Sequence, residues 1–182
     1  MAFNIELEFL GTWTQAQTAI VRDAADKWES MIDDGATASA THPSYRSIDG
    51  SVNPYSGQTI NDLFISVGAE ELAEGILGSA SISYVRNDEA SREYYMPYYG
   101  WIKFSTTYLD SYSTTTLPGS GTLIDGTAVG AKSKLYYVAG HEIGHMLGIA
   151  GNIWNVSSKR QWVTDSFYNL ENGYISVSAR ED

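Results

Sequence analysis

The segment from Ala131 to Gly148 constrains the fold of this chain more than any other. Its pattern is helical, with apolar side chains on nearly every side, and a helix that is apolar all round has to be buried. The same segment contains the run His141-Glu142-Ile-Gly-His145. Imidazole and carboxylate groups are costly to bury unless they have a partner, such as a metal ion. The segment therefore predicts a buried helix that carries a metal site.

The spacing of the polar residues in this run favours zinc chemistry. Residues four apart share one face of a helix, so the imidazoles of His141 and His145 are expected to point into the same space. Two neutral imidazoles suit Zn²⁺, and Glu142 between them can reach a metal-bound water as general base. Gly144 and Gly148 each weaken the helix by about 1 kcal/mol, which indicates close packing or a turn. The alternative without a metal site is a helix with two partly exposed His side chains and a solvated Glu side chain.

The remaining pattern predicts a strand, a helix, several strands and then the motif helix. Apolar and polar residues alternate from Phe3 to Phe9, as in a half-buried strand. Thr14 and Gln17 form a capping-box pattern before a helix that is expected to reach Ile32. Short strands are expected at 63–67, 80–85 and 101–104, and long loops at 36–60 and 111–122. This order predicts an α+β or α/β fold, with a twisted mixed sheet packed on two long helices.

Length and composition indicate one domain, residues 1–182, made of a sheet-and-helix part (1–149) and a short irregular C-terminal segment (150–182). The net charge of −11 argues against nucleic-acid binding, because phosphate repels such a surface. The absence of cysteine excludes disulfides and thiolate metal sites. We expect no signal peptide and no membrane span. The location is therefore open: cytoplasmic, or released or particle-associated by another route.

Several segments together resemble the leishmanolysin-like zinc metallopeptidases of the metzincin clan. They are Phe3-Asn-Ile-Glu-Leu-Glu-Phe9 with the helix of Trp28, Gly75-Ile-Leu-Gly78, Tyr99-Gly-Trp-Ile-Lys-Phe104, and His141-Glu-Ile-Gly-His-Met-Leu-Gly148 continuing to Trp154. The resemblance covers about residues 3–155 and implies a zinc endopeptidase with a metzincin-like N-terminal subdomain. It implies that His141 and His145 are zinc ligands and that Glu142 is the base. It also implies that Trp101, Ile102, Lys103 and Phe104 form an edge strand on which an extended peptide or protein substrate lies antiparallel.

The chain departs from the metzincin pattern at the third ligand. The expected His would fall at position 151, which is Gly151, and no His follows His145. No Met follows Met146, so the Met of the metzincin turn is also missing. Asp165, separated from His145 by 19 residues, has the spacing at which thermolysin-like peptidases place a ligand Glu.

Each candidate for the third ligand also has an ordinary structural reading. Asp165 fits a helix cap or a surface acid, and Glu171 is a poorer candidate on the same grounds. His42 would need its long loop to fold over the cleft, and otherwise is an exposed loop residue. The sequence leaves the third ligand open.

Two functions therefore follow from the sequence. The first is a zinc-dependent endopeptidase that hydrolyses peptide bonds through a zinc-bound water activated by Glu142. The second is a catalytically impaired, peptidase-derived structural or binding module with a protein assembly partner, for example as a component of a phage or viral particle. The missing third His and Met turn motivate the second.

Overall fold

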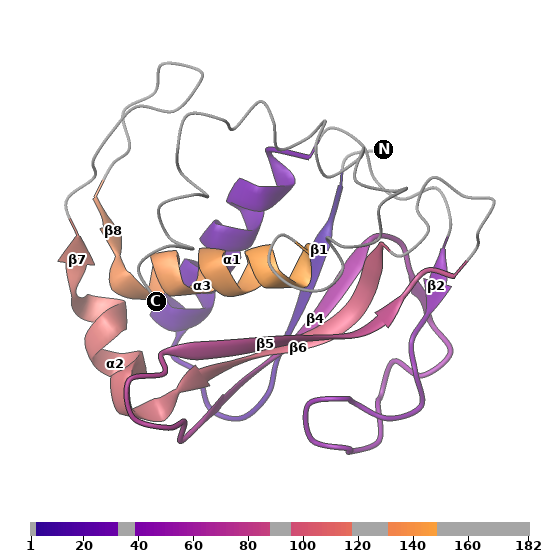
Figure 1. Ribbon diagram of the computed structural model, residues 1–182, viewed down its shortest axis with the longest axis horizontal. Coiled ribbons are helices and arrows are strands. Elements are labelled where there is room, and N and C mark those ends of the chain that lie inside the picture. Colours follow the sequence, from indigo (N-terminus) through magenta and orange to yellow (C-terminus); the bar gives the residue numbers. More distant parts are fainter. Residues whose placement is uncertain (1–2, 33–38, 88–95, 118–130, 149–182) are drawn as a thin grey trace.

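A four-stranded mixed sheet with helices on one face forms the centre of the molecule (Figure 1). The computed structural model describes residues 3–32, 39–87, 96–117 and 131–148. The strands of the main sheet are β1 (Ile5–Phe9), β4 (Leu63–Glu70), β5 (Gly78–Val85) and β6 (Pro97–Ser105). The helices are α1 (Gln15–Glu29), α2 (Thr106–Thr114) and α3 (Lys134–Met146). Two small ribbons pair β2 (Ala40–Thr41) with β3 (Thr59–Ile60), and β7 (Thr116–Leu117) with β8 (Lys132–Ser133).

The order of the strands in the sheet is β1-β4-β6-β5. The strands β1, β4 and β6 run parallel, and β5 runs antiparallel to β6. The two edges of the sheet are therefore β1 on one side and β5 on the other. The predicted α+β class with a twisted mixed sheet is confirmed.

The first strand and helix form where the sequence predicts them. Alternation puts Ile5 in the core and leaves Glu8 on the other face. The capping box is present: the amide of Gln17 donates to the hydroxyl of Thr14 over 3.2 Å, and the amide of Thr14 donates to the side chain of Gln17 over 2.9 Å. The helix ends at Glu29, before Ile32, which still packs into the core.

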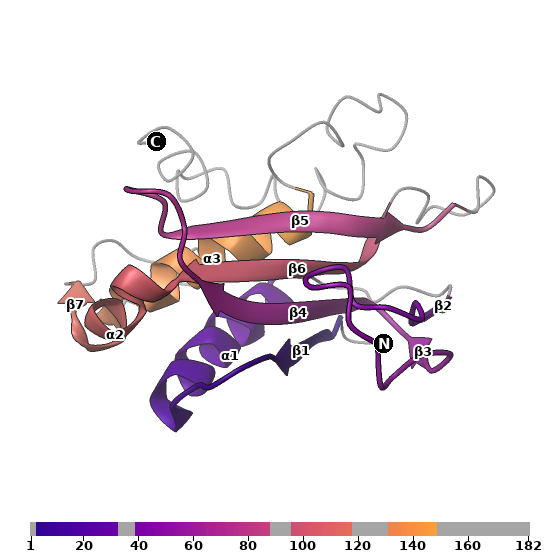
Figure 2. The ribbon, with the colours of Figure 1, turned by 90° about the horizontal axis from the view of Figure 1, so that it is seen from below.

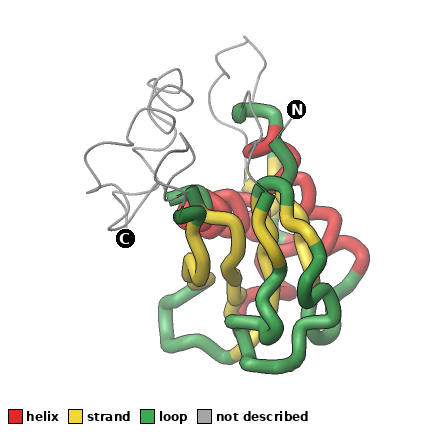
Figure 3. The backbone as a smooth tube through the Cα atoms, turned by 90° about the vertical axis from the view of Figure 1, so that its right-hand side faces the viewer, coloured by secondary structure: helices red, strands yellow, loops and turns green. Residues whose placement is uncertain are grey.

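The two longer helices, α1 and α3, lie on the same face of the sheet (Figure 1), and the division into a strand layer and a helix layer can be followed in Figure 3. Side chains from this face of β1, β4 and β6, such as Ile5, Ile65 and Ile102, form one core with both helices. At about 25 cal/mol per Å² of apolar surface, this burial is the main stabilising contribution to the fold. Within the described residues, no helix is long and apolar enough to cross a membrane.

The other face of the sheet is covered in part by the segment 39–62, which crosses in front of β4 in Figure 2. This segment was expected to be a loop, and it contains β2, β3 and a bridge between Tyr45 and Val52. A second, smaller core of Ile60, Phe64 and Tyr99 lies under it.

The sequence did not predict α2, which is a third, shorter helix within the described residues. Its sequence, Thr-Thr-Tyr-Leu-Asp-Ser-Tyr-Ser-Thr, is rich in residues that favour loops and turns. Leu109 is buried in the main core, and this tertiary contact outweighs the weak local preference. The expected boundary at residue 149 and the segment 150–182 lie outside the described residues.

Candidate metal centre

The run His141-Glu142-Ile-Gly-His145 lies in the last two turns of α3. The helix begins after Ser133, whose hydroxyl accepts the amide of Tyr136 over 3.2 Å. It ends at Met146, followed by Gly148 with a φ of 81°. This left-handed backbone conformation favours glycine and closes the helix, because the amide of Gly148 reaches the carbonyl of His145. Of the two explanations that the sequence leaves for Gly148, close packing or a turn, the turn is observed.

The two His rings converge as their spacing predicts. The Nε2 atoms of His141 and His145 are 2.9 Å apart, and the rings meet edge to face at 85°. Both side chains are only partly buried. At this separation the Nε2–H of one neutral ring can donate to the Nε2 of the other, and the tautomers decide which ring is the donor. The helix spacing thus brings two imidazole nitrogens into the same space.

Glu142 lies beside this pair and faces the sheet. Glu142 is only 6% exposed, which is unusual for a residue with a carboxylate side chain. Its side chain packs against Gly78, the first residue of β5: a Cβ built on Gly78 would lie 2.9 Å from both Cγ and Oε1 of Glu142. The carboxylate is thus held at the end of an edge strand.

Two contacts fix α3 on its neighbours. The indole Nε1 of Trp28 donates to the carbonyl of Gly140 over 2.8 Å, which joins α1 to the turn that precedes His141. On the sheet, Gly100 of β6 leaves room for Met146, because a Cβ there would lie 2.2 Å from its Cε. Both contacts lie within one helical turn of the motif, so they determine where the His pair and Glu142 stand relative to the sheet.

Within the described residues, no strand pairs with the outer edge of β5, and the backbone of β5 presents hydrogen-bonding groups there. The amide of Ser105 donates to the carbonyl of Leu77, which makes these two residues a hydrogen-bonded pair. In an antiparallel ladder such pairs alternate with pairs whose backbone groups point away from each other. Following the register, the backbone groups of Gly78, Ala80 and Ile82 point away from β6, toward the free edge.

The prediction that Trp101, Ile102, Lys103 and Phe104 form an edge strand is wrong. These residues belong to β6, which pairs with β4 on one side and with β5 on the other. Ile102 and Phe104 are buried in the main core, and Lys103 forms an ion pair with Glu70 of β4 at 3.0 Å. The local pattern identified a strand correctly, but its place in the sheet depends on pairing with distant segments. The edge next to α3 is β5.

His42 does not lie near the His pair. It is buried, at 5% exposure, against Phe64 and Tyr99 on the face of the sheet opposite to α3. Both expectations for His42, an exposed loop residue and a residue over the cleft, are wrong. The aromatic side chains of Phe64 in β4 and Tyr99 in β6 bury its ring. Burial lowers the pKa of His42 below its usual value, with Glu8 acting in the opposite direction.

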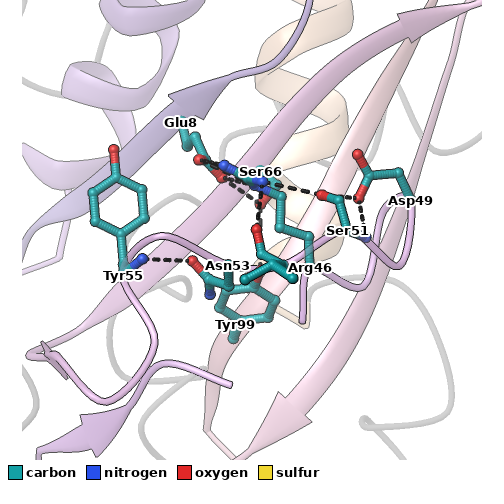
Figure 4. A network of polar contacts seen from close by, with 9 residues as sticks. Glu8, Arg46, Asp49, Ser51, Asn53, Tyr55, Ser66 and Tyr99 are labelled. Atoms are coloured by element: carbon teal, nitrogen blue, oxygen red, sulfur yellow. Dashed lines mark hydrogen bonds and ion pairs between the residues drawn. The ribbon is translucent and has the colours of Figure 1, made fainter. Parts of the chain in front are cut away.

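A network of polar side chains lies on the same face of the sheet as His42 (Figure 4). The guanidinium of Arg46 forms an ion pair with Glu8 of β1, and both side chains are largely buried. The hydroxyl of Ser66 donates to the same carboxylate over 3.2 Å. Burial raises the pKa of Tyr99 at the edge of this network. The network ties the segment 39–62 to β1 and β4, and contains no convergent set of metal ligands.

The His pair meets part of what zinc requires. Two nitrogen ligands of one tetrahedral zinc ion, each about 2.0–2.1 Å from the metal, stand about 3.3 Å apart, and the 2.9 Å between the two Nε2 atoms is close to that separation. In the part of the chain that the structure describes, no group of three His, Asp or Glu side chains could hold a metal ion. Asp165, Glu171 and Gly151 lie outside the described residues. The described residues therefore bring together two nitrogen donors of the kind that zinc accepts.

Sequence reasoning did not identify Gly78 as part of this site. Gly78 belongs to the segment Gly75-Ile-Leu-Gly78 that carries part of the resemblance, and it lies two residues before the strand expected at 80–85. A glycine next to a strand can indicate a close approach of other atoms to the backbone. Comparison with family models, with characterised proteins and with solved structures finds no match to this chain.

Proposed function

We propose that this chain is a zinc-dependent endopeptidase. One observation carries the proposal: two convergent His nitrogens and a buried carboxylate lie together beside β5, the strand at one edge of the sheet in the described residues. We also propose that its fold is a metzincin-like subdomain, in which the second long helix carries the motif. The geometry of the His pair and the free edge supports it independently of the resemblance in sequence.

The His pair and Glu142 would have separate roles. His141 and His145 would hold Zn²⁺ through Nε2, together with a third ligand for which Asp165 remains the candidate. When bound, zinc lowers the pKa of water and polarises the carbonyl of the substrate. Glu142 would accept a proton from the attacking water and donate it to the leaving amine. Its burial against Gly78 keeps the carboxylate beside the reacting groups, where it needs little reorganisation.

The edge of β5 would bind the substrate. An extended peptide can add to an exposed edge by backbone hydrogen bonds, and the backbone groups of Gly78, Ala80 and Ile82 point in that direction. Gly78 also contacts Glu142, so a peptide on this edge would pass the carboxylate. Backbone recognition implies an unfolded or extended protein substrate with little dependence on side chains.

The test combines metal content with a substitution of the base. We expect purified protein to carry about one zinc ion and to cleave an unfolded protein, because catalytic zinc sites hold one ion. Glu142→Gln preserves shape and removes the base, and is expected to reduce kcat by about 10²–10⁴-fold. Glu8→Gln is the matched control, because it neutralises a largely buried carboxylate on the other face of the sheet. Cleavage by Glu142→Gln at the wild-type rate, with unchanged zinc, would contradict the proposal.

One observation favours the second candidate, a peptidase-derived module without activity. The described residues bring together only two ligands, and a site with two His holds zinc weakly. This candidate predicts substoichiometric zinc at near-neutral pH and no cleavage with added zinc. Stoichiometric zinc in the purified protein argues against it.

A further inference from the structure

Gly78 makes an unusually close contact with the motif helix. A Cβ built on it would lie 2.9 Å from Cγ and from Oε1 of Glu142, and 3.1 Å from Cδ. Nonbonded carbon atoms normally stay about 3.5–4.0 Å apart. Any residue other than glycine would therefore displace the side chain of Glu142, or separate α3 from β5.

The backbone at this position does not itself require glycine. Among the described glycines, those with a positive φ are Gly11, Gly50, Gly57, Gly75 and Gly148, and Gly78 is not one of them. Gly75, three residues earlier, shows the opposite case: its φ is 83° and nothing lies within 4 Å of the place for a Cβ. Gly75 meets a conformational need of the turn, whereas Gly78 meets a need for space beside Glu142.

We propose that Gly78 is a positioning residue for Glu142, an inference that rests on the proposed peptidase function. A Glu side chain has several rotatable bonds and loses about 1.5–2 kcal/mol of conformational entropy when fixed. Here the side chain of Glu142 packs against the bare Cα of Gly78, and Glu142 is only 6% exposed. The backbone groups of Gly78 face the free edge, so the same residue places the base beside the strand of the substrate.

The kinetic test uses Gly78→Ala in the full chain, with an unfolded protein as substrate. Misplacement of a catalytic group by about 1 Å can reduce the rate by about 100-fold. We therefore expect kcat to fall by about that factor, while KM and zinc content change by less than about twofold, because the strand edge and the His pair remain. This separation of kcat from KM and from metal content would not arise from a general loss of structure.

Gly68→Ala is the matched control. Gly68 lies within β4, and a Cβ there would also meet a side-chain atom at 2.9 Å, but that atom is Cδ1 of Ile48 on the face away from α3. The control thus adds the same methyl group with a similar close contact. We expect it to keep the kcat of the wild type.

A second measurement does not depend on activity. If the methyl group collides with Glu142, then Gly78→Ala lowers Tm in the wild-type background but has little effect in a Glu142→Ala background, where the space is open. An equal Tm decrease in both backgrounds would overturn the inference, as would wild-type kcat in Gly78→Ala or a kcat decrease matched by loss of zinc. Absence of cleavage by the wild type would refute the proposed function, and the Tm cycle would then still decide the role of Gly78.

Discussion

The two edges of the sheet differ at their first outward-facing residues. At the edge formed by β1, the amide of Ile5 donates to Glu29 over 2.6 Å, and its carbonyl accepts from Arg22. Both partners belong to α1 and are joined to each other by an ion pair of 2.5 Å. At the edge formed by β5, no side chain of the described residues hydrogen-bonds to the backbone of Gly78, Ala80 or Ile82.

This difference indicates which edge is available to a partner strand. Unpaired edge groups attract other chains, and proteins commonly cover them with side chains or helices. The first outward-facing residue of β1 is covered in this way by α1. Among the described residues, none pairs with the outward backbone groups of β5 next to Glu142, and such an edge can accept an extended chain.

The largest expected effect comes from breaking the join between β5 and the rest of the sheet. In Gly100→Ala, the new Cβ would lie 2.2 Å from Cε of Met146 and 2.4 Å from the carbonyl oxygen of Ser81. The latter is backbone and cannot move aside by rotation. We expect a loss of at least about 3 kcal/mol in the free energy of unfolding, measured with urea. A loss below about 1 kcal/mol would show that β5 and α3 are less tightly packed than this structure describes.

A proline at the free edge tests recognition of the substrate. In Ala80→Pro the lost amide points away from β6, so no bond of the ladder is removed. If the substrate pairs with this edge, KM should rise about tenfold or more, while Tm falls by a few degrees. Ser81→Pro is the control for folding, because its amide faces Trp101 of β6, and it should lower Tm much more. An unchanged KM in Ala80→Pro would place the substrate elsewhere.

Opening the edge of β1 should have a smaller effect, on stability alone. Arg22→Ala removes the donor to the carbonyl of Ile5 and the ion pair with Glu29. Because both side chains are partly exposed, we expect a loss of about 1 kcal/mol in the free energy of unfolding. The rate of cleavage below the Tm should be unchanged, because β4 and β6 separate this edge from β5. A change in KM would show that the two edges are not independent.

The smallest expected effect is a pH dependence on the side of the sheet away from α3. His42 has a lowered pKa in the folded state because it is buried, so the unfolded chain binds more protons as the pH falls. Its contribution to stability is full above the unfolded pKa of about 6.5 and is lost as the pH falls toward the folded value. We expect Tm to decrease below about pH 6.5, and to decrease less in His42→Asn. An equal decrease in both proteins would assign the effect to other groups.

Much of the fold was predictable because its signals are local. The capping box of Thr14 and Gln17 and the alternation from Phe3 to Phe9 depend on neighbouring residues alone, and both are observed. The helix α2 was missed because its Ser and Thr residues have little helical preference, and its burial through Leu109 is a tertiary effect. The burial of His42 likewise depends on Phe64 and Tyr99, which are distant in sequence.

The sequence by itself determined the convergence of His141 and His145, because residues four apart share a helix face whatever the rest of the chain does. It also determined the turn at Gly148, where the backbone needs a conformation that favours glycine. The tertiary structure alone decided that β5, rather than β6, forms the edge beside the motif, because strand order arises from pairing between distant segments. It alone placed Gly78 against Glu142, so that a Cβ at this position would displace a side chain that only folding brings there.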